Sequence, residues 1–326
     1  MTGTFKANNP INHFLLLMYG LVLHIPFLWH PVEPTTAATD GYFYRYLIHW
    51  IEPAGIAFPW LYSIIAFMLV YLQAIGINNL VNRQKMLPKP NYLPAMSYLL
   101  ITATLPEWRV LSAPLIMATF LVWILSQLSR LYNHPNGRSI VFNIGMALGT
   151  ATLFYFPGLA FILLVVVGLS ITRPFKLTEW ITAFLGMLAP AYFYAAWIFL
   201  TDQWQDFELP SVRFVSSGFH KTISTYLALG LILLALLVGS AFVQNSLNRL
   251  LVQSRKCWGL IYVYLITGLL MPLLAGSFGP DNWMLVLAPV AAIMAAGLFY
   301  PDRKWYGWVM HWGLLALAVI NGYFIR

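Results

Sequence analysis

Apolar segments long enough to cross a lipid bilayer follow one another along almost the whole of this 326-residue chain. A transmembrane helix needs about 20 mostly apolar residues, and its backbone polar groups must be satisfied within the membrane. The sequence therefore predicts an all-α, polytopic transmembrane protein. We expect about eleven spans, at residues 13–30, 56–80, 92–106, 109–131, 139–156, 157–172, 179–201, 225–247, 258–276, 282–300 and 306–324.

The spans leave little room for a soluble domain. Charged residues make up only 9% of the chain, against about 25% in an average soluble domain. We expect a single transmembrane domain over residues 1–326, with two longer outer loops at 31–55 and 202–224. The first apolar run lacks a small-residue cleavage site, so we interpret it as a retained helix rather than a signal peptide.

The distribution of basic residues predicts the orientation. With a cytoplasmic N-terminus and an outer C-terminus, 13 of the 18 Lys and Arg residues fall in inner segments, as the positive-inside rule requires. The net charge of +8 is then explained by insertion into the inner (cytoplasmic) membrane, and no nucleic-acid partner is expected. The inner basic residues are Lys6, Arg83, Lys85, Lys89, Arg130, Arg138, Arg173, Lys176, Arg249, Arg255, Lys256, Arg303 and Lys304.

Acidic residues divide the opposite way. In this orientation eight of the ten lie on the outer side, namely Glu33, Asp40, Glu52, Glu107, Asp202, Asp206, Glu208 and Asp281. Acidic residues contribute little to orientation, so their placement suggests a function on the outer face.

The first outer loop contains a stretch, residues 39–52, whose pattern predicts a helix lying in the headgroup layer. Read as a helix, it places Tyr44, Leu47, Ile48 and Ile51 on one face and Arg45, His49 and Glu52 nearer the other. Asp40 stands at its start.

Asp40 and Glu107 are the candidate catalytic residues. A carboxylate held at the membrane surface can act as a general base on a hydroxyl, or bind a divalent cation that neutralises a phosphate. If a metal is bound, we expect Asp40 to be its ligand. The structural alternative is that Asp40 caps the helix and Glu107 pairs with Arg109.

Basic residues on the outer side are candidates for binding a lipid phosphate. Arginine suits phosphate because its planar fork donates two parallel hydrogen bonds. The candidates are Arg45, Arg109, Arg213 and Lys221. Contact with ordinary lipid headgroups is the alternative for each of them.

Several other site classes are absent from the sequence. There is no GxxxxGK[ST] loop, GxSxG elbow or GxGxxG fingerprint, and the histidines form no HxxxH or HExxH pair. The single cysteine, Cys257, excludes an intramolecular disulfide. No acidic residue lies well inside a span, which disfavours an ion-coupled transporter.

Three passages resemble the membrane core of the GT-C superfamily, glycosyltransferases that use polyprenyl-phosphate-linked sugars. They are the acidic first outer loop with its surface helix from Asp40, the central region 142–190, and the late outer turn at 279–292. The chain departs from that pattern: the first-loop acid is single, Asp281-Asn282-Trp283 replaces a late basic position, and no outer C-terminal domain follows. The N-terminal segment Asn9-Pro-Ile-Asn12, which leads into the first span, also resembles that of uncharacterised membrane proteins from Bacteroidota.

The resemblance implies sugar transfer from a polyprenyl-phosphate donor on the outer face, with membrane lipids as further partners. Two alternatives remain: a non-catalytic membrane subunit or scaffold of an envelope assembly that binds a protein partner, and a lipid or solute transporter.

Overall fold

The structure, a computed structural model, describes residues 2–132, 134, 137–202, 222–276, 279–301 and 304–324. Every regular element in these residues is a helix. The long helices are α2 (Ile11–Trp29), α3 (Tyr42–Ala57), α4 (Trp60–Arg83), α5 (Leu93–Thr102), α6 (Ala113–Arg130), α7 (Gly137–Phe154), α8 (Ile162–Thr172), α9 (Leu177–Leu200), α10 (Ile223–Ser246), α11 (Val252–Leu269), α14 (Leu287–Phe299) and α15 (Lys304–Val319). Short helical segments are α1 (Thr2–Lys6), η1 (Pro106–Arg109), η2 (Phe156–Phe161), η4 (Leu247–Arg249), α12 (Met271–Leu274), α13 (Pro280–Trp283), η5 (Met284–Val286) and η6 (Ile320–Phe324).

Seven helical segments in the described residues are long and apolar enough to cross a membrane, as in a multi-pass membrane protein. They are α2, α4, α6, α9, α10 with η4, α11 with α12, and α13 through α14. The four other predicted spans overlap α5, α7, η2 with α8, and α15 with η6. The number of eleven spans and the cytoplasmic N-terminus remain predictions.

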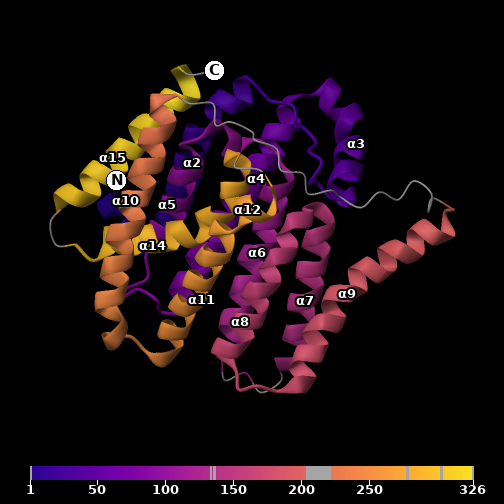
Figure 1. The fold of residues 1–326 in the computed structure, drawn as a ribbon. Helices are drawn as coiled ribbons and strands as arrows, with labels where there is room; N and C mark the ends of the chain where they lie inside the picture. The colour runs from indigo at the N-terminus through magenta and orange to yellow at the C-terminus, as the bar shows by residue number, and fades with distance from the viewer. Residues whose placement is uncertain are drawn as a thin grey trace.

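Two apolar helices, α5 and α14, lie inside the bundle. All ten residues of α5 are buried, and the helix is about 15 Å long, half the thickness of the hydrocarbon core. The segment 92–106 therefore does not make a full span alone. Figure 1 shows α14 running across α10 rather than alongside it, and the residues of α14 from Leu287 to Leu298 are all buried.

The α7–α9 pair depends on glycines. A Cβ atom on Gly145 would meet the Ala183 carbonyl oxygen at 2.1 Å, and one on Gly149 would meet the Met187 oxygen at 2.2 Å. From α9, a Cβ on Gly186 would meet the Phe142 oxygen at 2.3 Å. The two backbones thus touch where side chains are missing, the packing typical of small-xxx-small motifs in membrane helices.

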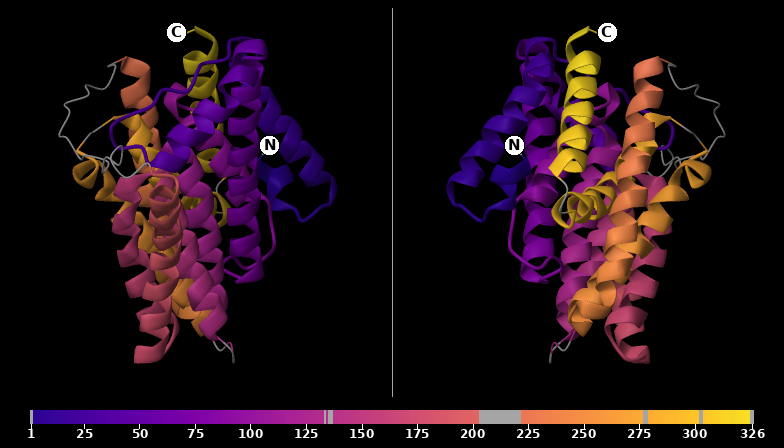
Figure 2. Two further views of the ribbon diagram at one scale, coloured as in Figure 1. Left: turned by 90° about the vertical axis from the view of Figure 1, so that its right-hand side faces the viewer. Right: turned by 90° about the vertical axis from the view of Figure 1, so that its left-hand side faces the viewer.

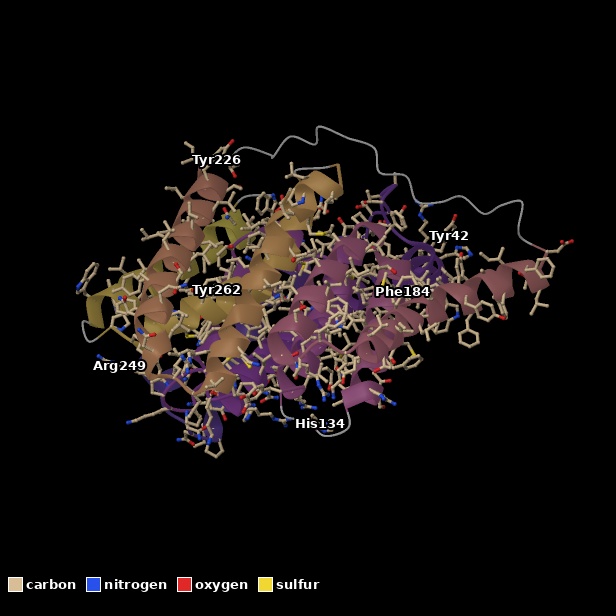
Figure 3. The ribbon with its side chains drawn as sticks, turned by 60° about the horizontal axis from the view of Figure 1, so that its bottom comes forward. Tyr42, His134, Phe184, Tyr226, Arg249 and Tyr262 are labelled. Atoms are coloured by element: carbon tan, nitrogen blue, oxygen red, sulfur yellow. The ribbon has the colours of Figure 1, made fainter. Side chains whose placement is uncertain are left out.

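The bundle has two chemically different ends. The connections α8–α9 and α10–α11 lie at the lower end of Figure 1, whereas α3 lies at the upper end. Figure 3 shows the same separation, with His134 and Arg249 far from Tyr42 and Tyr226. We call the upper end the α3 end. Asp40 and Glu107 lie there, away from the basic loops, in agreement with the charge separation that the sequence predicts.

Segments from the two ends of the chain lie side by side. Figure 2 shows the indigo N-terminal helices on one flank of the bundle, next to the yellow α15. The side chain of Arg109 joins them: Nη1 donates to the Leu23 oxygen of α2 at 3.0 Å and Nη2 to the Ala318 oxygen of α15 at 3.1 Å.

Replacing Gly149 by Val should destabilise the protein, because the new side chain would have to displace the Met187 backbone. Overpacking of this kind costs about 1–3 kcal/mol. Gly230→Val on α10 is the matched control, since a Cβ there meets nothing within 4 Å. Thermal unfolding in detergent should give a lower Tm for Gly149→Val alone. Equal effects of both substitutions would contradict the close α7–α9 contact.

Candidate functional site

A cavity of about 720 Å³ lies at the α3 end of the bundle. Its wall is built by four segments that are distant in sequence: the loop before α3, the η1–α6 connection, the end of α7, and the region around α13. The residues that line it are Val32, Glu33, Thr35, Ala37, Ala38, Thr39, Asp40, Glu107, Val110, Leu111, Ser112, Ala113, Pro114, Tyr155, Ala275, Gly279, Pro280, Asp281 and Asn282.

Asp40 is fixed in this wall by its glycine neighbour. The Gly41 amide donates to the Phe154 oxygen at 2.8 Å, and Asp40 forms a backbone bridge with Tyr155. A Cβ on Gly41 would lie 2.1 Å from the Leu153 oxygen, so only glycine allows this approach. The Asp-Gly sequence thereby attaches the start of α3 to the end of α7 and buries the carboxyl group.

Aromatic side chains hold the other walls in place. The Tyr44 hydroxyl donates to the Leu111 oxygen at 3.1 Å, and the Trp108 indole N–H donates to the Pro280 oxygen at 2.8 Å. The Tyr155 hydroxyl donates to Asn282 Oδ1. Tyr44, Trp108 and Tyr155 are all nearly inaccessible to solvent, so these hydrogen bonds connect the segments across a buried floor.

Burial raises the pKa of the Asp40 carboxyl from 3.8 to about 6, and the negative charge of Asp281 adds to the increase. The Ala37 amide, which donates to Oδ2 at 2.7 Å, and the charge of Arg45 act in the opposite direction. Only 5% of Asp40 is exposed. A carboxyl group with a pKa near neutrality can exchange a proton with a bound hydroxyl, which is what a general base must do.

The cavity collects several acidic residues. Glu107 and Asp281 line it together with Asp40, and the exposed Glu33 lies on its wall. Glu107 forms no salt bridge with Arg109 in the described structure, where the ion pairs are His49–Glu52 and Arg173–Glu179. Within the described ranges, no three His, Cys, Asp or Glu residues come close enough to hold a metal ion. Asp40 as the ligand of a bound cation stays a prediction from the sequence, and such a cation would need further ligands from the substrate or from water.

Arg45 connects the cavity to a second hollow. Its Nη2 lies 3.3 Å from the Ala37 oxygen and 3.4 Å from the Ala38 oxygen, on the loop that walls the cavity. Its side chain also lines a groove of about 880 Å³ between α3, α7 and α9. The groove is strongly aromatic, with Tyr42, Tyr46, Phe193, Tyr194 and Trp197 in its wall.

The groove opens where α9 leaves the bundle. The C-terminal part of α9 leans away from the bundle in Figure 1, and Phe193 and Trp197 are 70% and 63% exposed. Exposed aromatic residues on a transmembrane helix face lipid or a partner helix. The groove therefore offers a sideways route from the surroundings of α9 to Arg45, beside Asp40.

The other predicted phosphate ligands lie elsewhere. Arg109 is 2% exposed and donates to backbone carbonyls of α2 and α15, and its guanidinium packs over the Phe27 ring at 4.9 Å. It does not line the cavity. Arg213 and Lys221 lie outside the described residues.

The helix predicted within residues 39–52 is present as α3, and its two faces are confirmed. Its position in the headgroup layer stays a prediction. Tyr44 is buried and Leu47, Ile48 and Ile51 pack against the core, whereas Arg45 is exposed. Asp40 itself precedes the helix, and its carboxylate bonds back to Ala37 rather than capping the first turn of α3.

Comparison with known proteins gives one match. Residues 47–325 match the family of unknown function DUF6427. The chain belongs to this family. No curated protein and no solved structure matches the chain. The matched region covers most of the chain and includes Glu107, Tyr155 and Asp281. Asp40 and Arg45 precede it.

Sequence reasoning missed part of the cavity. Tyr155 ends a predicted span and carries no pattern that separates it from other interfacial tyrosines. Asp281 gave a signal, because the predicted topology places it on the same side as Asp40 and Glu107. Its position across the cavity from Asp40 depends on α13 meeting η1 through Trp108, which no local pattern reveals.

Asp40→Asn should stabilise the protein at neutral pH. Because the folded-state pKa of Asp40 lies above its unfolded value, the folded state binds the proton more tightly, and stability falls as pH rises from about 4 to 6. At pH 7.5 the loss amounts to at most about 3 kcal/mol, and the neutral amide avoids it. Its oxygen can still accept from the Ala37 amide.

Thermal unfolding from pH 4 to 8 measures this effect. The Tm of Asp40→Asn should exceed that of the unmodified protein at pH 7.5, and the difference should vanish near pH 4. Glu33→Gln, which removes an exposed carboxylate of the same cavity, is the control. A difference between Asp40→Asn and the unmodified protein that does not depend on pH would refute the raised pKa.

Proposed function

We propose that the protein transfers a sugar from a polyprenyl-phosphate donor to a hydroxyl acceptor, on the outer face of the inner membrane, with Asp40 as the general base. The observation that carries the proposal is the buried Asp40 carboxyl, with its raised pKa, in a cavity beside a lipid-accessible aromatic groove. The resemblance to GT-C glycosyltransferases supports the same class of reaction.

The residues suggest a division of roles. The acceptor hydroxyl loses its proton to Asp40 and attacks the anomeric carbon of the donor sugar. A bond forms between the acceptor oxygen and this carbon, and the bond from the carbon to the phosphate oxygen breaks. Arg45 faces the leaving lipid phosphate, where its positive charge balances the developing negative charge. Glu107 orients the acceptor by accepting a hydrogen bond.

The geometry favours a lipid-linked donor over a soluble one. The apolar chain would lie in the groove against Tyr46 and Trp197, and the phosphate would reach Arg45 at its edge. The loop at Ala37 and Ala38 separates this edge from the Asp40 cavity. The sugar would thus extend over the loop toward the carboxylate. Arg213 and Lys221 remain proposed phosphate contacts on the strength of the sequence alone.

A second candidate is a non-catalytic membrane subunit, favoured by the exposed end of α9. Phe199 and Leu200 are 73% and 80% exposed there, and a transmembrane helix of another protein could pack against them. This function predicts a stoichiometric partner that co-purifies in mild detergent and is lost on substitution of α9 residues, together with tolerance of changes at Asp40.

The test of the transferase is an assay with polyprenyl-phosphate-linked radiolabelled sugars and membrane acceptors. Asp40→Asn should lower kcat by at least about 100-fold, as expected for loss of a general base. Since the base must be unprotonated, kcat/KM of the unmodified enzyme should rise with pH up to about 6 and then level off.

Arg45→Gln should mainly raise KM for the donor, because it removes a phosphate contact and leaves Asp40 in place. Glu52→Gln, which neutralises an exposed carboxylate on the same helix, is the control and should retain activity. Transfer at the normal rate by Asp40→Asn, or no transfer with any donor of this class, would reject the proposed mechanism.

A further inference from the structure

A third hollow, apart from the Asp40 cavity and the α9 groove, lies between the two ends of the chain, on the flank opposite α9. It is a groove of about 710 Å³ between α2 and α15, with a buried floor that includes Tyr19 and Leu23. Val22 and Trp312 stand on its rim and are 58% and 42% exposed. None of the described residues that line it carries a charge. The groove is therefore apolar and open at the side, toward the surroundings of the bundle.

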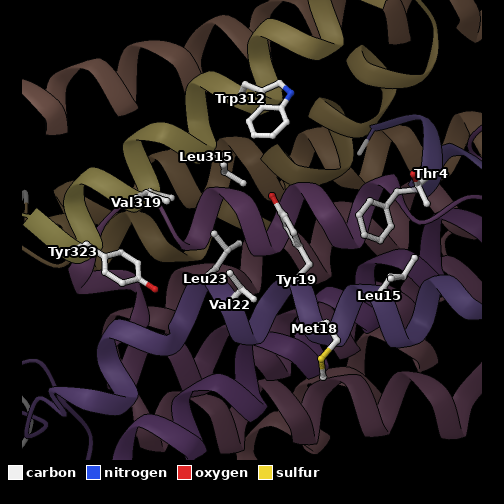
Figure 4. Close-up of a pocket in the computed structure, with 12 residues that line it drawn as sticks. Thr4, Leu15, Met18, Tyr19, Val22, Leu23, Trp312, Leu315, Val319 and Tyr323 are labelled. Carbon is white, nitrogen blue, oxygen red and sulfur yellow. The ribbon is translucent and has the colours of Figure 1, made fainter.

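One polar group on the floor has no partner. The Tyr19 side chain is 8% exposed, and its hydroxyl makes no hydrogen bond within the described part of the chain. Figure 4 shows the hydroxyl pointing into the groove, toward Leu315 and Trp312. Buried hydroxyl groups in native proteins are nearly always hydrogen-bonded. The orientation of Tyr19 thus indicates an acceptor inside the groove.

A histidine next to Tyr19 also lacks hydrogen-bond partners. The His311 ring stacks on Tyr19, with centroids 5.9 Å apart and planes at 27°. Neither of its ring nitrogens has a partner among the described residues, and the residue is 1% exposed. Two adjacent polar side chains from α2 and α15 therefore lack partners beside the same groove.

We propose that this groove binds one acyl chain of a membrane glycerolipid, with the Tyr19 hydroxyl donating to an ester carbonyl oxygen. The apolar lining suits the hydrocarbon chain, and the lack of charged residues leaves the charged headgroup outside. A carbonyl oxygen accepts hydrogen bonds without carrying a charge. The bilayer supplies the ligand through the open side, so no separate entry route is needed.

The site is independent of the Asp40 cavity. Its residues come from α1, α2, α15 and η6, and none of them lines the cavity or the α9 groove. A lipid held there would contact both ends of the chain, next to the two hydrogen bonds through which Arg109 joins α2 to α15.

Photolabelling of the full chain in nanodiscs tests the site. The probe is a phosphatidylethanolamine that carries a diazirine in one acyl chain, and the adducts are located by peptide mapping. We expect adducts within residues 15–23 and 312–323. Val22→Trp, which fills the groove from its rim, should lower this labelling by about tenfold. Leu237→Trp on α10 is the matched control, because Leu237 is equally exposed but outside the groove.

The hydrogen bond has its own test. Unlabelled diester lipid should compete for the probe more strongly than a dialkyl ether lipid of equal chain length, because the ether lacks the carbonyl. Tyr19→Phe should remove this preference, an effect of about fivefold. The proposed site would be rejected if the labelling were spread evenly over the lipid-exposed helices and Val22→Trp left it unchanged. The groove would then make only the contacts that any lipid-facing surface makes. An ester preference that survives Tyr19→Phe would overturn the carbonyl contact.

Discussion

Direct contact between backbones holds two helix pairs of this bundle together. Lipid is as apolar as a leucine side chain, so burial of apolar area cannot drive helix association inside a bilayer, and close packing must do so. Gly145, Gly149 and Gly186 let α7 and α9 touch. Gly239 of α10 similarly lies against α14, where its Cβ would meet the Ile293 oxygen at 2.3 Å. Shape, rather than hydrophobicity, decides which helices become neighbours.

The same constraint creates the candidate site. Gly41 brings the loop before α3 against the end of α7, and this contact encloses the Asp40 carboxyl. Burial then changes the chemistry of the group, because a carboxylate loses its hydration there and holds its proton more tightly. Packing and acidity are coupled at this point: the glycine that closes the loop also buries the aspartate, and burial raises the pKa of its carboxyl group toward neutrality.

Much of the architecture could be predicted from the sequence. Long apolar runs located most of the helices, apolar periodicity located α3, and charge separation placed Asp40 at the end opposite the basic loops. The short predicted span at 92–106 corresponds to α5, which is buried within protein, where a helix need not cross the bilayer. The crossing of α14 over α10 was equally hidden, since an Ala-rich apolar segment has the same sequence pattern whichever way it runs through the bundle.

The site was predictable only in part. Asp40 and Glu107 do line one cavity. They were predicted because most acidic residues fall on the predicted outer side of the membrane. Arg109 shows the limit of the same reasoning: its position in the chain suggested the cavity, but its side chain turns inward because the carbonyls of Leu23 and Ala318 accept its hydrogen bonds. Side-chain direction depends on contacts between segments about 200 residues apart in sequence, which local patterns do not encode.

Direct titration of Asp40 is the measurement closest to the central claim. Carboxyl ¹³C NMR of protein labelled at aspartate, with Asp40→Asn to assign the signal, gives the protonation midpoint of this one group. We predict a midpoint near pH 6. A midpoint near 4, the value of a freely hydrated aspartate, would contradict a buried carboxyl group and with it the proposed general base.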